Sequence, residues 1–208
     1  MRLLLLSLLL LAASAQAQPT LTAATNNPVV GDTVALFWCS TAGVAPGPAG
    51  AGITWDFHAL TAIDTFYQSV VRCDSTPKCD SFPGSNIAMK QDMPGGTSYS
   101  YLFADASIIE NLGGYATTGY YQYYTRPAVQ AHYPVMYTSS YLDTSIGFVP
   151  PINNTMQIDS SIVDGYGTLI LPSGTFTNVL RMHTFSVERD SVSGGGVSVT
   201  ARESYGWS

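Results

Sequence analysis

Short runs in which apolar and polar residues alternate recur along most of this 208-residue chain. The clearest are 53–58, where Ile53, Trp55 and Phe57 alternate with polar residues, and 197–207, which is apolar mainly at odd positions. Side chains of a strand alternate between its two faces, so this period of two indicates strands. No stretch of useful length has a helical period. The sequence therefore predicts an all-β fold, an antiparallel meander that forms a sandwich or a strongly curved sheet.

Individual strands can be predicted with their boundaries. The nearly continuous apolar run Thr33–Cys39 is typical of a strand buried on both faces. A tyrosine-rich strand is expected over Gly119–Thr125, ending before Pro127, because proline cannot donate to a sheet ladder. Residues 99–103 and 107–112 are expected to pair through the short link between them.

A hairpin is predicted late in the chain. Thr168–Leu171 and Phe176–Val187 flank Pro172-Ser173-Gly174, whose proline and glycine suit a type I turn with a bulge. Asp164-Gly165 is a further turn or bulge signal. Apolar residues change parity along the second arm, and a bulge near His183-Thr184 would reconcile them.

The first 17 residues carry the signature of a secretory signal peptide. Arg2 precedes a leucine tract too short to span a bilayer, and small residues at Ala15 and Ala17 fit a cleavage site. We expect export through the Sec pathway to the periplasm, cell surface or medium. Residues 18–208 are then one β-rich domain, and the apolar pattern that continues up to Trp207 predicts a chain truncated at its C-terminus.

Composition limits the partners. Only 11% of the residues are charged, the formal net charge is −6, and there are 13 tyrosines. An acidic chain without a basic cluster is a poor candidate for binding nucleic acid. No second apolar run approaches the length of a transmembrane helix. Carbohydrate or protein at a cell surface is the expected kind of partner.

The cysteines favour one disulfide. Cys73 and Cys79 flank a loop centred on Pro77, and export would permit them to bridge. The alternative is that all three thiols are reduced, with Cys39 a buried apolar side chain. His58 is the only histidine near the cysteines, so neither a metal nor another cofactor is expected.

Catalytic motifs are missing from the sequence. It contains no nucleophile elbow, zinc-protease motif or phosphate-binding loop. His58 and His183 fall on predicted polar faces of strands, and His132 falls in a loop. Asp159 and Asp164 would point to opposite faces of an unbulged strand, which argues against a catalytic carboxylate pair. The chain is therefore not predicted to be an enzyme.

The candidate binding residues are aromatic. Tyr120, Tyr121, Tyr123 and Tyr124 could stack on sugars or contact a protein. The alternative is ordinary cross-strand packing, which is the commoner role of tyrosine in a sheet.

Several segments resemble a recurrent type of uncharacterised secreted protein from Bacteroidetes bacteria. The similar stretches are residues 27–32 (NPVVGD), 46–51 (PGPAGA) leading to 54–57 (TWDF), 164–169 (DGYGTL) and 171–181 (LPSGTFTNVLR). The resemblance implies a β-rich region of the kind that precedes a C-terminal sorting domain for type IX secretion. It implies fold and export without an activity, and the sorting domain itself is absent from this sequence.

These observations predict a secreted, non-catalytic binding or structural module. Two alternatives stay open: a carbohydrate-binding module or hydrolase accessory domain, which needs coplanar exposed aromatics, and a carrier of an apolar ligand, which needs a lined cavity in a curved sheet.

Overall fold

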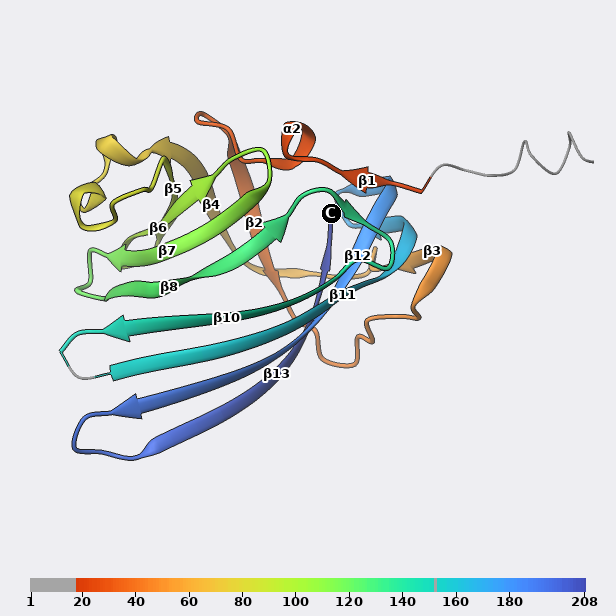
Figure 1. The fold of residues 1–208 in the computed structure, drawn as a ribbon. Helices are drawn as coiled ribbons and strands as arrows, with labels where there is room; N and C mark the ends of the chain where they lie inside the picture. The colour runs from red at the N-terminus through yellow and green to blue at the C-terminus, as the bar shows by residue number, and fades with distance from the viewer. Residues whose placement is uncertain (1–17, 152) are drawn as a thin grey trace, which may run out of the picture.

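The fold is a single strongly bent antiparallel sheet of 11 strands, with a second sheet of two short strands packed on it (Figure 1). The computed structural model describes residues 18–151 and 153–208. The predicted signal peptide lies outside the described residues. The all-β prediction is confirmed. The elements, in chain order, are β1 (Thr20–Leu21), α2 (Ala23–Asn26), β2 (Thr33–Cys39), β3 (Gly50–Asp56), β4 (Ala62–Arg72), two short 3-10 turns (Cys73–Ser75 and Cys79–Ser81), β5 (Ile87–Met93), β6 (Gly96–Ala104), β7 (Ile108–Ala116), β8 (Tyr121–His132), β9 (Val135–Met136), β10 (Ser140–Val149), β11 (Asn153–Leu171), β12 (Gly174–Val192) and β13 (Val197–Trp207).

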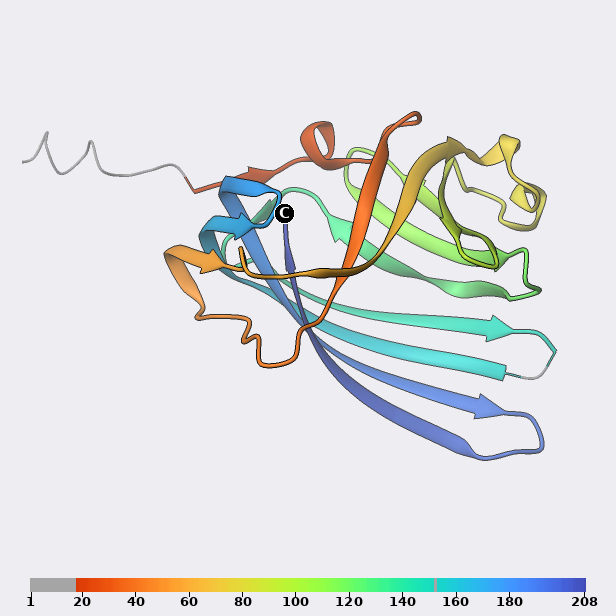
Figure 2. The ribbon, with the colours of Figure 1, turned by 180° about the vertical axis from the view of Figure 1, so that it is seen from behind.

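The large sheet is a meander, as the sequence predicts. Its strands follow the order β13-β12-β11-β10-β8-β7-β6-β5-β4-β2, so nearly every strand pairs with its neighbour in the chain. The long strands β11, β12 and β13 bend as they cross the molecule, which Figure 2 shows from behind. Among the described residues, no helix is long and apolar enough to cross a membrane.

Strand β3 departs from the meander. It pairs in parallel with the second half of β11, which short-range sequence patterns do not predict because the two segments are more than a hundred residues apart. The approach is so close that a Cβ atom on Gly167 would lie 1.8 Å from the carbonyl oxygen of Ile53. Glycine at this position is therefore required by the parallel pairing.

Apolar clusters lie on both faces of the sheet. On one face, β1 and β9 cover a cluster that includes Val163 and Leu180. On the other face, β3 packs Trp55 against Leu169 and Val179. Trp55 is only 2% exposed, so the apolar side of this alternating segment faces the core at Trp55. The hydrophobic core is therefore divided between the two faces of the bent sheet.

The prediction that Thr33–Cys39 is buried on both faces is wrong. The strand it forms, β2, is an edge strand that pairs only with β4. Phe37 and Trp38 are 56% and 59% exposed. An apolar run alone does not distinguish a central strand from an edge strand, since both faces of β2 are largely uncovered here.

The tyrosine-rich strand continues past Pro127, which corrects its predicted end. Strand β8 runs to His132, and it is irregular where the proline lies. Arg126 pairs with β10 and Ala128 pairs with β7, while Pro127 has no partner in either register. A proline is accommodated there because the ladder does not need its missing N–H.

The hairpin of β11 and β12 is confirmed, and so is the bulge signal at Asp164-Gly165, but the bulge predicted near His183-Thr184 is absent. The register shifts at Asp164 on β11 and between Val179 and Thr177 on β12, where Asn178 has φ 59°. The pairing is regular at 183–184. The change of apolar parity needs no bulge, because both faces of β12 carry apolar residues.

Candidate functional site

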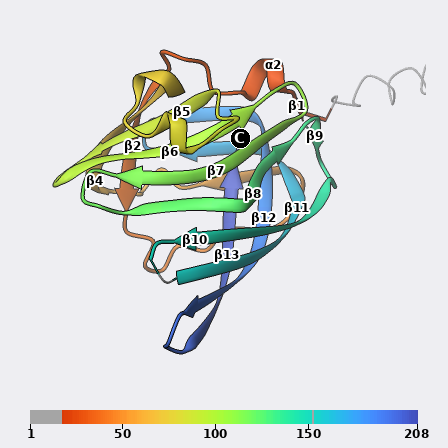
Figure 3. The same cartoon turned by 60° about the vertical axis from the view of Figure 1, so that its left-hand side comes forward.

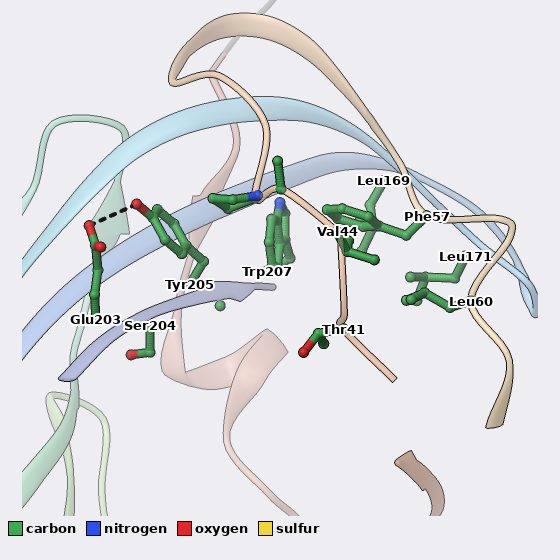
Figure 4. Close-up of a pocket in the computed structure, with 13 residues that line it drawn as sticks. Thr41, Val44, Phe57, Leu60, Leu169, Leu171, Glu203, Ser204, Tyr205 and Trp207 are labelled. Atoms are coloured by element: carbon green, nitrogen blue, oxygen red, sulfur yellow. Dashed lines mark hydrogen bonds between the residues drawn. The ribbon is translucent and has the colours of Figure 1, made fainter. Parts of the chain in front are cut away.

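A largely apolar pocket of about 630 Å³ lies beside the end of β13 (Figure 4). Its walls come from the loop after β2, the segment after β3, the end of β11 and the end of β13. Such a volume is typical of sites for small ligands. The larger apolar side chains of the lining are Val44, Phe57, Leu60, Leu169, Leu171 and Trp207.

Aromatic rings form one wall of the pocket. The Trp207 ring meets Phe57 edge-on, with centroids 5.2 Å apart, and meets Trp55 edge-on at 6.1 Å. Trp207 lies on β13, whereas the other two rings belong to β3 and the residue that follows it. Packing between the end of the chain and its first third therefore builds this wall.

The loop 40–49 closes another side of the pocket. A turn at its start is held by a hydrogen bond from the Val44 N–H to the Thr41 carbonyl (3.0 Å), with Gly43 at φ 77°. Further along, the indole N–H of Trp55 donates to the Pro48 carbonyl (3.1 Å). The position of Val44 over the pocket thus depends on contacts that the loop makes with the sheet.

A buried arginine anchors the same loop. Arg181, on β12, is 2% exposed. Its guanidinium donates to both carboxylate oxygens of Asp164 (2.8 and 2.9 Å) and to the carbonyls of Pro46 (3.0 Å) and Gly47 (2.9 Å). Bidentate pairing of this kind fixes both partners in one geometry. The bulge at Asp164 is what brings this carboxylate beside Arg181 (register shift between Val163 and Gly165).

A chain of polar contacts continues from Arg181 to the rim of the pocket. The guanidinium carbon lies 5.1 Å from the centroid of the Tyr205 ring and 5.4 Å from that of Trp55. The Tyr205 hydroxyl donates to Glu203 (2.9 Å), and this hydrogen bond is the main cause that raises the pKa of Tyr205. His183 stacks on Tyr205 with ring centroids 4.5 Å apart, and its Nε2 lies 2.7 Å from Glu203 Oε1.

This arrangement favours one class of ligand. The pocket is apolar inside, and Thr41, Ser204, Tyr205 and Glu203 supply oxygen atoms at its edge. The Arg181 guanidinium beside it is already neutralised by Asp164. A neutral or cationic amphipathic molecule fits such a site better than an anion. Within the described residues, no cluster of three or more potential metal ligands exists.

The four tyrosines singled out in the sequence do not share a face. Tyr121 and Tyr123 pack against the cluster around Phe82 and Tyr101, with ring centroids 6.2 Å apart. Tyr124 alternates with them along β8 and so projects to the opposite face. Tyr120, which immediately precedes the strand, donates its hydroxyl to Gln122 on that same opposite face (2.7 Å). Burial raises the pKa of both Tyr120 and Tyr124. The four rings therefore do not form one coplanar platform.

The disulfide expected between Cys73 and Cys79 is present, with Cα atoms 5.2 Å apart. It links the two 3-10 turns between β4 and β5. Next to it, Phe82 stacks on Tyr101 with centroids 4.1 Å apart. The bridge thus holds the segment that covers one end of the sheet (Figure 3).

The histidines are placed only partly as expected. His132, expected in a loop, is the last residue of β8. His58 is exposed beside Asp56, in agreement with its predicted polar face. His183 is instead half-buried against Tyr205 and Glu203, so its prediction as a solvent-facing histidine is wrong. Sequence reasoning also missed Arg181. A single arginine between Leu180 and Met182 in an otherwise uncharged strand segment was the available signal.

Comparisons with protein-family models, with curated proteins and with solved structures find no match to this chain.

Proposed function

We propose that this protein is an exported, non-catalytic binding domain whose apolar pocket takes a small amphipathic ligand. The single observation that carries the proposal is the cavity of about 630 Å³ lined by aliphatic and aromatic side chains. Of the classes that the sequence left open, a carrier of an apolar ligand in a curved sheet is the one that needs such a cavity. The leucine tract at the N-terminus supports export.

The polar groups at the rim support binding rather than catalysis. Glu203 accepts the Tyr205 hydroxyl, and the charge of Arg181 is paired with Asp164. These groups therefore satisfy one another. They can orient the head of a ligand, while the apolar walls supply most of the affinity.

The proposal is tested with two fluorescent probes of similar shape and different charge. Neutral N-phenylnaphthylamine should bind with enhanced emission and should quench tryptophan by energy transfer from Trp207. Anionic anilinonaphthalene sulfonate should bind at least about tenfold more weakly, because Glu203 lies at the rim.

A pair of matched variants tests whether the neutral probe binds in the pocket. Val44→Trp fills the pocket and should reduce binding of the neutral probe about tenfold or more. Val30→Trp adds the same bulk outside the pocket, at a valine of similar exposure (48% against 40%), and should change nothing. Equal affinities of the two variants, or a wild type that does not bind the neutral probe, would refute the proposed function.

A further inference from the structure

The two faces of the sheet over β10–β13 are unlike each other in composition. Directly opposed residues of antiparallel strands lie on the same face, so the register defines five rows of four side chains on one face. We call this the apolar face. Its rows are Val197-Ser191-Asn154-Phe148, Val199-Arg189-Met156-Ile146, Ala201-Val187-Ile158-Thr144, Glu203-Phe185-Ser160-Leu142 and Tyr205-His183-Ile162-Ser140.

The opposite face over the same rows is polar. It carries, for example, Asp143 and Asp159 opposite each other, and Glu188 paired with Arg202. On β10, β11 and β12 the polar residues are the better enclosed ones, and Ser145 is only 2% exposed. In a sheet whose polar face points to water, the apolar residues would be the better enclosed ones.

The apolar face is uncovered. Its exposed members include Leu142 at 77%, Val199 at 66% and Phe185 at 49%. Elsewhere the same side of the sheet is covered, by the loop that Arg181 anchors and by the segment around Phe82. Contiguous apolar surface of this extent on a protein marks an interaction site.

We propose that the apolar face is the interface of a homodimer, in which two copies of this chain stack their sheets face to face. Five rows about 6.8 Å apart on four strands about 4.8 Å apart cover on the order of 600 Å². Two copies would bury on the order of 1,200 Å² together, which reaches the lower end of the range for specific interfaces. Stacked sheets with interdigitating apolar faces are the ordinary architecture of a sandwich core.

Charge placement favours a second copy over another partner. The face carries one arginine, Arg189, and one carboxylate, Glu203, on neighbouring strands. They lie one row to either side of the central row, which contains Val187 and Ala201. A two-fold axis across the strands at that row would set Arg189 of each copy beside Glu203 of the other. It would also place Leu142 over Ile146 of the second copy.

The experiment measures the mass of the full chain by light scattering and by sedimentation over a concentration series. The wild type should be a dimer, and Leu142→Asn together with Phe185→Asn should weaken dimerisation about tenfold or more. Leu142→Asn alone is a milder variant, since its exposed side chain contributes little to the folded monomer. Ile63→Asn is the matched control: Ile63 is 73% exposed and lies on β4, outside the apolar face.

The charges supply an independent test. Arg189→Glu should weaken the dimer, and Arg189→Glu with Glu203→Arg should restore it. Circular dichroism checks that each variant is folded. A monomeric wild type would overturn the proposal. So would wild-type monomers that bind phosphatidylcholine vesicles through Leu142, or a dimer that tolerates the face variants and is abolished by Thr200→Pro at the β13 edge.

Discussion

Replacing the buried arginine is the sharpest test of how the loop and pocket are held. Arg181→Met keeps much of the side-chain volume but removes four hydrogen bonds, two to Asp164 and one each to the Pro46 and Gly47 carbonyls. Arg181 is 2% exposed and Asp164 is 15% exposed, so water can replace few of these bonds. Removing one member of a buried ion pair typically costs about 3–5 kcal/mol because the other charge stays unpaired.

The assay is urea unfolding followed by tryptophan fluorescence, together with thermal unfolding. For a domain of this size, each kcal/mol corresponds to about 2–4 °C, so a lowering of the melting temperature by about 10 °C is expected. The variant should also lose affinity for the neutral probe, because the loop that carries Val44 is no longer anchored.

The control is a salt bridge of the same chemistry on the surface. Arg72 pairs with Asp74, but the two side chains are 70% and 63% exposed. Such pairs contribute little, so Arg72→Met should leave the unfolding midpoint nearly unchanged. If Arg181→Met and Arg72→Met unfold at the same urea concentration, the buried pair does not stabilise the fold more than the surface pair does.

Three further outcomes are expected. Reducing the Cys73–Cys79 bridge, which closes a short loop, should lower the free energy of unfolding by about 2 kcal/mol, measured by urea unfolding with and without reductant; an unchanged midpoint would contradict it. Trp55→Ala should cost about 3–5 kcal/mol, because the ring is 2% exposed in a packed cluster, and a midpoint equal to the wild type would show that the cluster is not part of the core. Burial raises the pKa of Tyr124 above its unfolded value of about 10, so its contribution to stability is complete below that pH and is lost as the pH rises through the raised pKa. Tyr124→Phe should therefore make the alkaline loss of stability smaller, and a variant with the wild-type pH profile would exclude this tyrosine as a cause.

Local patterns predicted the strands and the meander because both depend on near neighbours. The hairpin after Leu171 and the disulfide between Cys73 and Cys79 follow from turn residues a few positions apart. The parallel pairing of β3 with β11 does not, since it joins segments more than a hundred residues apart. Local patterns do not predict the pocket either, because its walls come from segments spread between Thr41 and Trp207. Arg181 was missed for the same reason: its loop partners lie at residues 46 and 47.

Alternation shows that a strand has two unlike faces, but it does not show which face is enclosed. On β12, Phe185 and Val187 alternate with Ser186 and Glu188, and the ordinary expectation is that the apolar pair lies inside. Here Phe185 is 49% exposed, while the Glu188 side chain is only 22% exposed. The sheet is bent, and its other strands enclose the polar face of β12. The curvature of the whole sheet therefore decides which face is enclosed, and the local alternation of apolar and polar residues does not. An apolar face left outside in this way gains stability only when another surface covers it, and this is why the oligomeric state of the protein is a direct test of the proposed interface.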